Sequence, residues 1–180
     1  MSRGKVFVEI SHLKKHYPVS KGIFVNKGVA VRAVDDISFQ IREQQNLGIV
    51  GESGCGKSTM GKTILRLIEP TGGRIVFDGK ELFYVEENRY MKPKELSDLR
   101  KEMTMIFQDS YSSLNPHMTI GEAVKAGVAR HHIVAKEEIV DYCKNVLSAC
   151  GLEKRAYDSY PNEFSGGQRQ RAVIARALAL

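Results

Sequence analysis

The chain of 180 residues, 42% hydrophobic and 27% charged, has the size and composition of one globular domain, or of one domain with a small appendage. Its net charge of +6 would suit a polyphosphate, nucleic acid or an anionic lipid surface, but its basic residues are scattered and favour none of these. No run approaches the ~18 apolar residues of a membrane span, the N-terminus does not resemble a signal peptide, and three cysteines without a CxxC pair indicate reduced thiols; we expect a cytosolic or peripheral protein.

Short strands are predicted over the first 50 residues, because apolar and polar side chains alternate there. Residues 5–13 and 33–41 each have this pattern, and the Gly-containing stretch between them, 19–31, predicts a hairpin or loop. The stretch QNLGIV, residues 45–50, predicts a short buried strand that leads directly into a group of glycines.

Helices and strands alternate over the next part of the chain. The apolar spacing from Met60 to Ile68 predicts a helix that Pro70 ends. Beyond it we expect a strand, an Asp-Gly turn and a return strand over 74–83, a short helix over 95–103 and a buried strand over 104–108.

From residue 115 to residue 152 the pattern is helical throughout. Thr119 and Glu122 have the spacing of a capping box, and Gly151 is placed to end the second helix. Cys143 and Cys150 lie seven residues apart on one apolar helix face, so both are predicted to belong to the core. A last helix is expected to begin at Gly166.

A phosphate-binding loop is the first motif that carries chemistry. The stretch GESGCGKST fits G-x-x-x-x-G-K-[ST] and lies between a predicted strand and a predicted helix. Glycines let successive N–H groups turn toward phosphate oxygens, and the helix dipole faces the same anion. Lys57 is placed to reach the β- and γ-phosphates and the Ser58 hydroxyl to bind Mg²⁺. The predicted nucleotide-binding residues of this loop are Gly51, Glu52, Ser53, Gly54, Cys55, Gly56, Lys57, Ser58 and Thr59.

The start of the last helix carries a second motif. Ser165 and Gln168 have capping-box spacing, but Gly166 and Gly167 at the first two helical positions each weaken the helix by up to about 1 kcal/mol. Close approach of an anion to bare backbone N–H groups would offset that loss. Helix capping alone is the alternative.

Three stretches in this order resemble the ATP-binding subunit of an ATP-binding cassette (ABC) transporter: GESGCGKST, MIFQDSYSSLNPHMTI and FSGGQRQRAVIARAL. The stretch FQDSYSSLNP and the insertion HYPVSKGIFVNKGVAVRAVDDISF are similar to the oligopeptide and dipeptide importer branch. The resemblance covers nearly the whole chain. It implies an α/β fold with a P-loop NTPase (RecA-like) core, an antiparallel β subdomain and a helical insert.

The resemblance also implies roles for single residues. Gln108 matches the glutamine that contacts Mg²⁺ or the attacking water, and with Lys57 it makes the predicted catalytic pair. Ser165, Gly166, Gly167 and Gln168 match the signature motif, although Phe164 stands where the family more often has leucine. Tyr17 is at the place of the aromatic residue that stacks on adenine; packing within the first hairpin is the alternative.

The partners implied are transmembrane permease subunits, a second ATP-binding subunit paired head to tail, and, indirectly, an extracytoplasmic solute-binding protein. Each ATP, with its Mg²⁺, would lie between the P-loop of one subunit and the signature helix of the other. The expected place of such a subunit is the cytoplasmic face of the cell membrane, and nucleic acid is not an expected partner.

The resemblance divides the chain into the β subdomain with the first part of the core (1–108), a helical subdomain (109–165) and the signature helix (166–180). The family's next strand, with the Walker B Asp-Glu pair, would follow Leu180. Asp35–Asp36 and Glu86–Glu87 do not end a buried apolar strand, and we expect them to be solvated turn or surface charges. We therefore expect these 180 residues alone to bind ATP weakly and not to turn it over.

Three other interpretations remain open at this point. A soluble ABC ATPase acting on nucleic acid would use the same chemistry, but FQDSYSSLNP and the absence of a basic run favour transport. SGGQ argues against a P-loop kinase or GTPase. A non-catalytic short product of a transporter gene is the third alternative.

Overall fold

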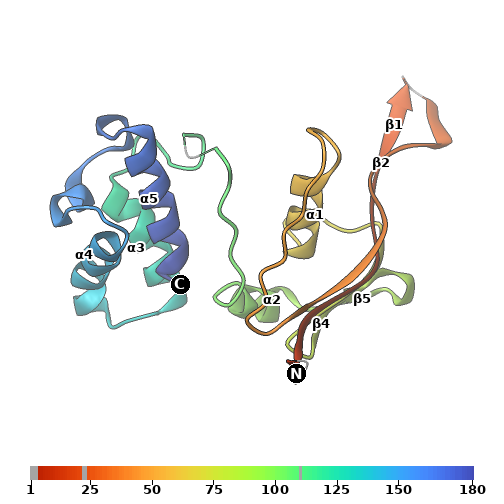
Figure 1. Ribbon diagram of the computed structural model, residues 1–180, viewed down its shortest axis with the longest axis horizontal. Coiled ribbons are helices and arrows are strands. Elements are labelled where there is room, and N and C mark those ends of the chain that lie inside the picture. The colour runs from red at the N-terminus through yellow and green to blue at the C-terminus, as the bar shows by residue number, and fades with distance from the viewer. Residues whose placement is uncertain (1–3, 22–23, 110) are drawn as a thin grey trace. The chain divides into compact units, whose positions relative to one another are not determined.

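The computed structural model describes residues 4–21, 24–109 and 111–180 (Figure 1). The chain divides into two compact units, residues 1–96 and 97–180, and each is described by itself. The three-part division with boundaries after residues 108 and 165 stays a prediction. No helix in the described ranges is both long and apolar enough to cross a bilayer.

The first unit is built on an antiparallel sheet with strand order β2-β1-β3-β4-β5. Its strands are β1 (Val6–Lys21), β2 (Phe24–Arg42), β3 (Gly72–Phe77), β4 (Lys80–Tyr84) and β5 (Arg89–Tyr90). β1 and β2 form a long ribbon (Figure 1). The predicted hairpin over 19–31 thus contains paired strands, while residues 22 and 23 lie outside the described residues. The predicted Asp-Gly turn is confirmed, with positive φ at both Asp78 (42°) and Gly79 (74°).

A bulge in β1 changes which of its residues face the core. Val8 and Ile10 are buried, and the next buried position is Leu13 rather than residue 12, because the pairing register shifts between Ile10 and Leu13. His12 has a φ of 52° at this point. Gly73 on β3 accommodates the bulge, since a Cβ there would lie 2.5 Å from the His12 carbonyl oxygen.

Helix α1 (Lys57–Ile64) is shorter than predicted. Instead of continuing to Ile68, the chain takes a left-handed residue at Arg66 (φ 49°). The Leu67 N–H donates to the Lys62 carbonyl at 2.8 Å, which closes the helix end. The Arg66 guanidinium donates to the Met91 carbonyl at 2.8 Å and stacks on Tyr90, so tertiary contacts end the helix before Pro70.

Two predicted strands are not formed in the structure. Residues 45–50 and 104–108 are in neither helix nor strand, and Leu47, Ile49 and Val50 are exposed by 41%, 46% and 94%. A strand is held by backbone hydrogen bonds to a neighbour, and in the part of the chain that the structure describes no strand pairs with either stretch. An apolar pattern alone does not determine whether another strand lies beside these residues.

The second unit is helical. After α2 (Pro93–Leu99), which crosses the division, it contains α3 (Ile120–His131), α4 (Ile139–Ala149) and α5 (Gly166–Leu178), with short 3₁₀ turns between them. These three helices lie side by side (Figure 1) and pack around one apolar cluster. The buried members of the cluster are Leu114, Ile120, Val124, Val128, Ile139, Cys143, Leu147, Leu152, Ala156, Ala172, Val173, Ala175 and Ala179.

The predicted ends of these helices are confirmed. Thr119 and Glu122 form a reciprocal capping box at the start of α3. At the end of α4, Gly151 is left-handed (φ 75°), and the Leu152 N–H donates to the Leu147 carbonyl at 3.0 Å, as in a Schellman motif. Cys143 is fully buried in the core and Cys150 packs against it, as predicted.

Candidate functional site

The loop before α1 has a backbone that requires glycine. Gly54 and Gly56 are left-handed, with φ of 83° and 97°. Gly56 is also the N-cap of α1, and a Cβ on it would overlap the carbonyl oxygen of Ala33 on β2. A Cβ on Gly51 would lie 2.8 Å from the Cys55 sulfur. The glycines therefore let the loop fold tightly onto the β1–β2 ribbon.

The first turn of α1 presents free backbone donors. The first intrahelical bond runs from the Met60 N–H to the Gly56 carbonyl at 2.8 Å, so the N–H groups of Lys57, Ser58 and Thr59 have no carbonyl within the helix. No side chain in the described part of the chain caps this end. Such a terminus attracts anions through its free N–H groups and its dipole.

The Lys57 ammonium group folds back over the loop. Its Nζ donates to the carbonyl oxygens of Gly51 at 2.7 Å and Glu52 at 2.6 Å, and it lies 3.4 Å from the Cys55 sulfur. The loop thus holds a positive charge beside the open helix end. This arrangement fits a polyphosphate, whose oxygens would accept from the ammonium and the helical N–H groups.

Tyr17 lies on the ribbon beside this loop. It pairs with Val31 across β1 and β2, two residues from Ala33, which contacts Gly56. Its side chain is 38% exposed, and the Lys15 ammonium lies 4.8 Å from the ring centroid. The ring is accessible for stacking and also contributes to the ribbon, so both interpretations of Tyr17 remain.

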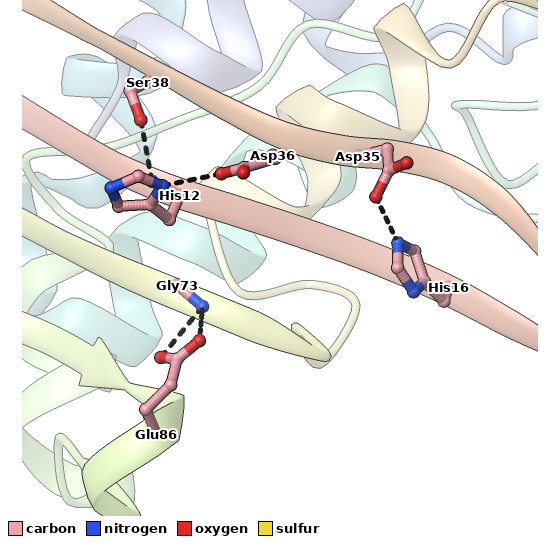
Figure 2. A network of polar contacts seen from close by, with 7 residues as sticks. All are labelled: His12, His16, Asp35, Asp36, Ser38, Gly73 and Glu86. Carbon is pink, nitrogen blue, oxygen red and sulfur yellow. Dashed lines mark hydrogen bonds and ion pairs between the residues drawn. The ribbon is translucent and has the colours of Figure 1, made fainter.

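The acidic pair Asp35–Asp36 on the ribbon contacts two histidines (Figure 2). His16 Nε2 lies 2.8 Å from Asp35 Oδ1, and His12 Nδ1 lies 2.7 Å from Asp36 Oδ1. The hydrogen bond from His16, followed by that from Arg32, lowers the pKa of Asp35. Both carboxylates are exposed, as predicted, at 42% and 53%. Their histidine partners were missed because they lie 19 and 24 residues away and are brought close only by strand pairing.

Glu86 also has a structural partner. Its carboxylate accepts from the Gly73 N–H at 2.9 and 3.1 Å, beside the bulge of β1 (Figure 2). Glu87 pairs with Arg89 at 3.0 Å. Within the described ranges, no cluster of three or more His, Cys, Asp or Glu side chains is arranged to hold a metal ion.

The signature residues form the N-terminus of α5 in the second unit. Ser165 is the N-cap, and its hydroxyl accepts from the Gln168 N–H at 3.3 Å, while the Gln168 side chain accepts from the Ser165 N–H at 2.9 Å. Gly166 and Gly167 are exposed, and a Cβ on either would meet nothing within 4 Å. No packing among the described residues requires glycine here, so the helix start is open to an approaching group.

Gln108, in the same unit, is exposed and followed by a tight turn. Asp109 Oδ1 accepts from the Tyr111 N–H at 2.8 Å, and the Ser113 hydroxyl donates to the Asp109 carbonyl at 2.5 Å. Hydrogen bonds from the Ser112 side chain and then from the Tyr111 and Ser112 N–H groups lower the pKa of Asp109. The structure therefore groups Tyr17 with the P-loop in one unit, and Gln108 with Ser165 in the other.

Known proteins share this sequence and fold. The family model described as ABC transporter matches residues 34–180. The chain is 41% identical over 98% of its length to the oligopeptide transport ATP-binding protein AppF of Bacillus subtilis (strain 168) and 44% identical over 96% to OppF of the same organism. OppF of Escherichia coli (strain K12) is 41% identical over 98%. The chain covers 52%, 53% and 52% of these relatives, and thus spans about half their length.

Solved structures agree with the sequence comparison. The dimeric structure of MJ0796, described as a bacterial ABC transporter cassette, matches 96% of this chain and 69% of its own, with a TM-score of 0.78 and 28% identity. A post-hydrolysis state of the same cassette with ADP and Pi has a TM-score of 0.77 at 29% identity, with the same shares covered. The predicted fold class is thereby confirmed. On this evidence, the chain belongs to the ABC transporter family.

Proposed function

We propose that this chain is the nucleotide-binding part of the ATPase of an ABC importer, and that the importer carries oligopeptides or dipeptides. The observation that carries the proposal is the loop Gly51–Thr59, with its left-handed glycines, open helix start and folded-back lysine. The peptide class is supported by the names of the relatives at about 40% identity, which are oligopeptide transport ATP-binding proteins.

In this proposal the loop holds the phosphates of ATP. The N–H groups of Lys57, Ser58 and Thr59 donate to phosphate oxygens, and the Lys57 ammonium exchanges its two carbonyl acceptors for the β- and γ-phosphates. The Ser58 hydroxyl is exposed at the helix start, where it could ligate Mg²⁺, which would neutralise phosphate charge. The roles of Gln108 with Mg²⁺ or water and of Tyr17 with adenine remain parts of the proposal.

A second copy or a paralogous subunit supplies the other half of the site. The open glycines at the start of α5 support this, because an anion or a partner can approach the backbone there without steric hindrance. The similar cassette MJ0796 has been solved as a dimer. Closure of such a dimer on ATP would drive movement of permease subunits, and the ATPase would sit at the cytoplasmic face of the membrane. An extracytoplasmic binding protein would deliver the peptide.

The test is ATP binding, measured on the parent chain, on Lys57→Ala and on the control Lys94→Ala, which removes an exposed lysine of α2. Loss of charge-assisted hydrogen bonds should weaken ATP binding by at least about tenfold in Lys57→Ala. The control should bind like the parent. Equal affinity of Lys57→Ala and parent would refute the assignment of this loop.

A further inference from the structure

Two of the arginines on α5 are half-buried. Arg169 and Arg176 lie seven residues apart and so share one face of the helix. Both are half-buried, and neither makes an ion pair with any residue that the structure describes. A guanidinium stays charged in proteins, so a half-buried one needs other acceptors.

Arg176 finds its acceptor on a distant loop. Its Nη1 donates to the Ser113 carbonyl oxygen at 2.5 Å, and burial lowers its pKa. The next residue of that loop, Leu114, is 3% exposed and belongs to the core cluster. The loop is therefore anchored to α5 by a charged hydrogen bond beside a buried apolar side chain.

Arg169 contacts both the same loop and the approach to its own helix. Its Nη1 donates to the carbonyl of Phe164 at 2.7 Å, directly before the N-cap Ser165. Its guanidinium carbon lies 5.4 Å from the centroid of the Tyr111 ring. One side chain thus touches the residue that precedes the signature motif and the turn that follows Gln108.

The turn between these contacts is compact. Asp109 holds it together through the Tyr111 N–H at 2.8 Å and the Ser113 hydroxyl at 2.5 Å. Gln108 is bonded covalently to its first residue. The turn that follows Gln108 is therefore linked to both arginines, through Tyr111 to Arg169 and through Ser113 to Arg176.

We propose that Arg169 and Arg176 are positioning residues that tie the turn after Gln108 to the start of the signature helix within one chain. Through this link, a change in the conformation of Gln108 would alter the surroundings of Ser165. The functional role of this coupling rests on the proposed function, whereas the contacts themselves do not. Coupling through such a chain of packed and hydrogen-bonded groups requires that both ends respond to a change in the middle.

The experiment is hydrogen exchange on the nucleotide-free chain, comparing Arg176→Met and Arg169→Met with the control Arg171→Met, which removes an exposed charge from the same helix. We expect exchange about tenfold faster than in the parent at two places in both test variants: the amides of Tyr111 and Ser112, and the amide of Gln168. Arg171→Met should exchange like the parent. Arg176→Lys, which keeps one donor for the Ser113 carbonyl, should restore most of the protection.

Faster exchange at only one of the two places, or the same acceleration in Arg171→Met as in the test variants, would overturn the proposal. Circular dichroism shows whether each variant folds. If Arg176→Met does not fold, Tyr111→Ala tests the same link from the other side, because Tyr111 is 73% exposed and its loss leaves the core intact. Nucleotide binding is measured in a separate experiment. The exchange result can therefore be interpreted even if the proposed function is wrong.

Discussion

Gly54 and Gly56 differ in what surrounds them, although both are left-handed and both belong to the phosphate loop. Gly54 is open, with nothing within 4 Å of the position a Cβ would take. Gly56 lies directly against the carbonyl of Ala33 on β2. The first glycine is thus required by backbone conformation alone, and the second also by close packing of the loop on the sheet.

Substitution of each glycine by alanine should separate these two requirements. Gly54→Ala adds only the strain of a left-handed alanine and should cost about 1 kcal/mol in free energy of unfolding. Gly56→Ala adds overlap with a backbone atom and should cost about 3 kcal/mol. Urea unfolding of both variants and the parent gives the comparison. Equal losses would show that the contact with Ala33 does not constrain the loop.

The two capped helices α3 and α5 begin with the same device but in different surroundings. Thr119 caps α3, whose second residue, Gly121, packs against Tyr157. Ser165 caps α5, whose first glycines face open space. Capping accounts fully for the first helix start, and leaves the glycines of the second unexplained.

Alanine at each N-cap should distinguish capping from ligand binding. Thr119→Ala and Ser165→Ala should both lower the free energy of unfolding by about 1 kcal/mol, because each removes one cap hydrogen bond. Only Ser165→Ala should also weaken ATP-dependent self-association, measured by sedimentation. If Thr119→Ala weakened association equally, the effect would reflect stability and the signature role of Ser165 would be unsupported.

At this scale the sequence predicted what depends on near neighbours. The capping boxes, the Asp78–Gly79 turn and the stop at Gly151 are local and were all predicted. The stretches 45–50 and 104–108 were predicted as strands and are not, because a strand needs a distant partner. The same limit hid the His16–Asp35 pair and the contacts of α5 with the Asp109 turn.

The site was more predictable than the sheet. Gly51–Thr59 and Ser165–Gln168 are each contiguous, so their spacing alone predicted a loop and a helix start that the structure shows. What these residues bind remains a proposal, since it depends on groups outside this chain. The premature end of α1 at Ile64 was not predictable, because it follows from the contacts of Arg66 with Met91 and Tyr90.

For the whole molecule, the proposed function divides into two separable steps: nucleotide binding by one unit, and recognition of the bound nucleotide by the other unit of a partner. In this proposal the first step would use the loop Gly51–Thr59 of residues 1–96, and the second the start of α5 in residues 97–180. If instead the phosphate loop and the start of α5 of one chain bound the same nucleotide, a substitution in either would change the affinity of the monomer for ATP.

Gly166→Asp tests this division. A Cβ at this position would meet nothing within 4 Å among the described residues, so the fold should persist, but the carboxylate would repel the phosphates of a partner's nucleotide. The monomer should bind ATP within about twofold of the parent, and ATP-driven dimerisation should be lost. Gly166→Ala, which adds bulk without charge, is the control. A roughly tenfold loss of ATP affinity in the monomer would contradict the two-molecule arrangement.

The hydrogen bonds of Lys57 to Gly51 and Glu52 have a consequence for how affinity should be understood. The ammonium group already donates to these two carbonyl oxygens. In the proposed function, the phosphates of a nucleotide would therefore replace existing acceptors instead of pairing with a free charge. Measured affinity is then the difference between these two sets, and the ordering of the lysine side chain belongs to folding rather than to binding. A substitution that weakens these carbonyl contacts but leaves the ammonium group in place would make the loop less ordered. It could nevertheless raise the affinity of the loop for its ligand.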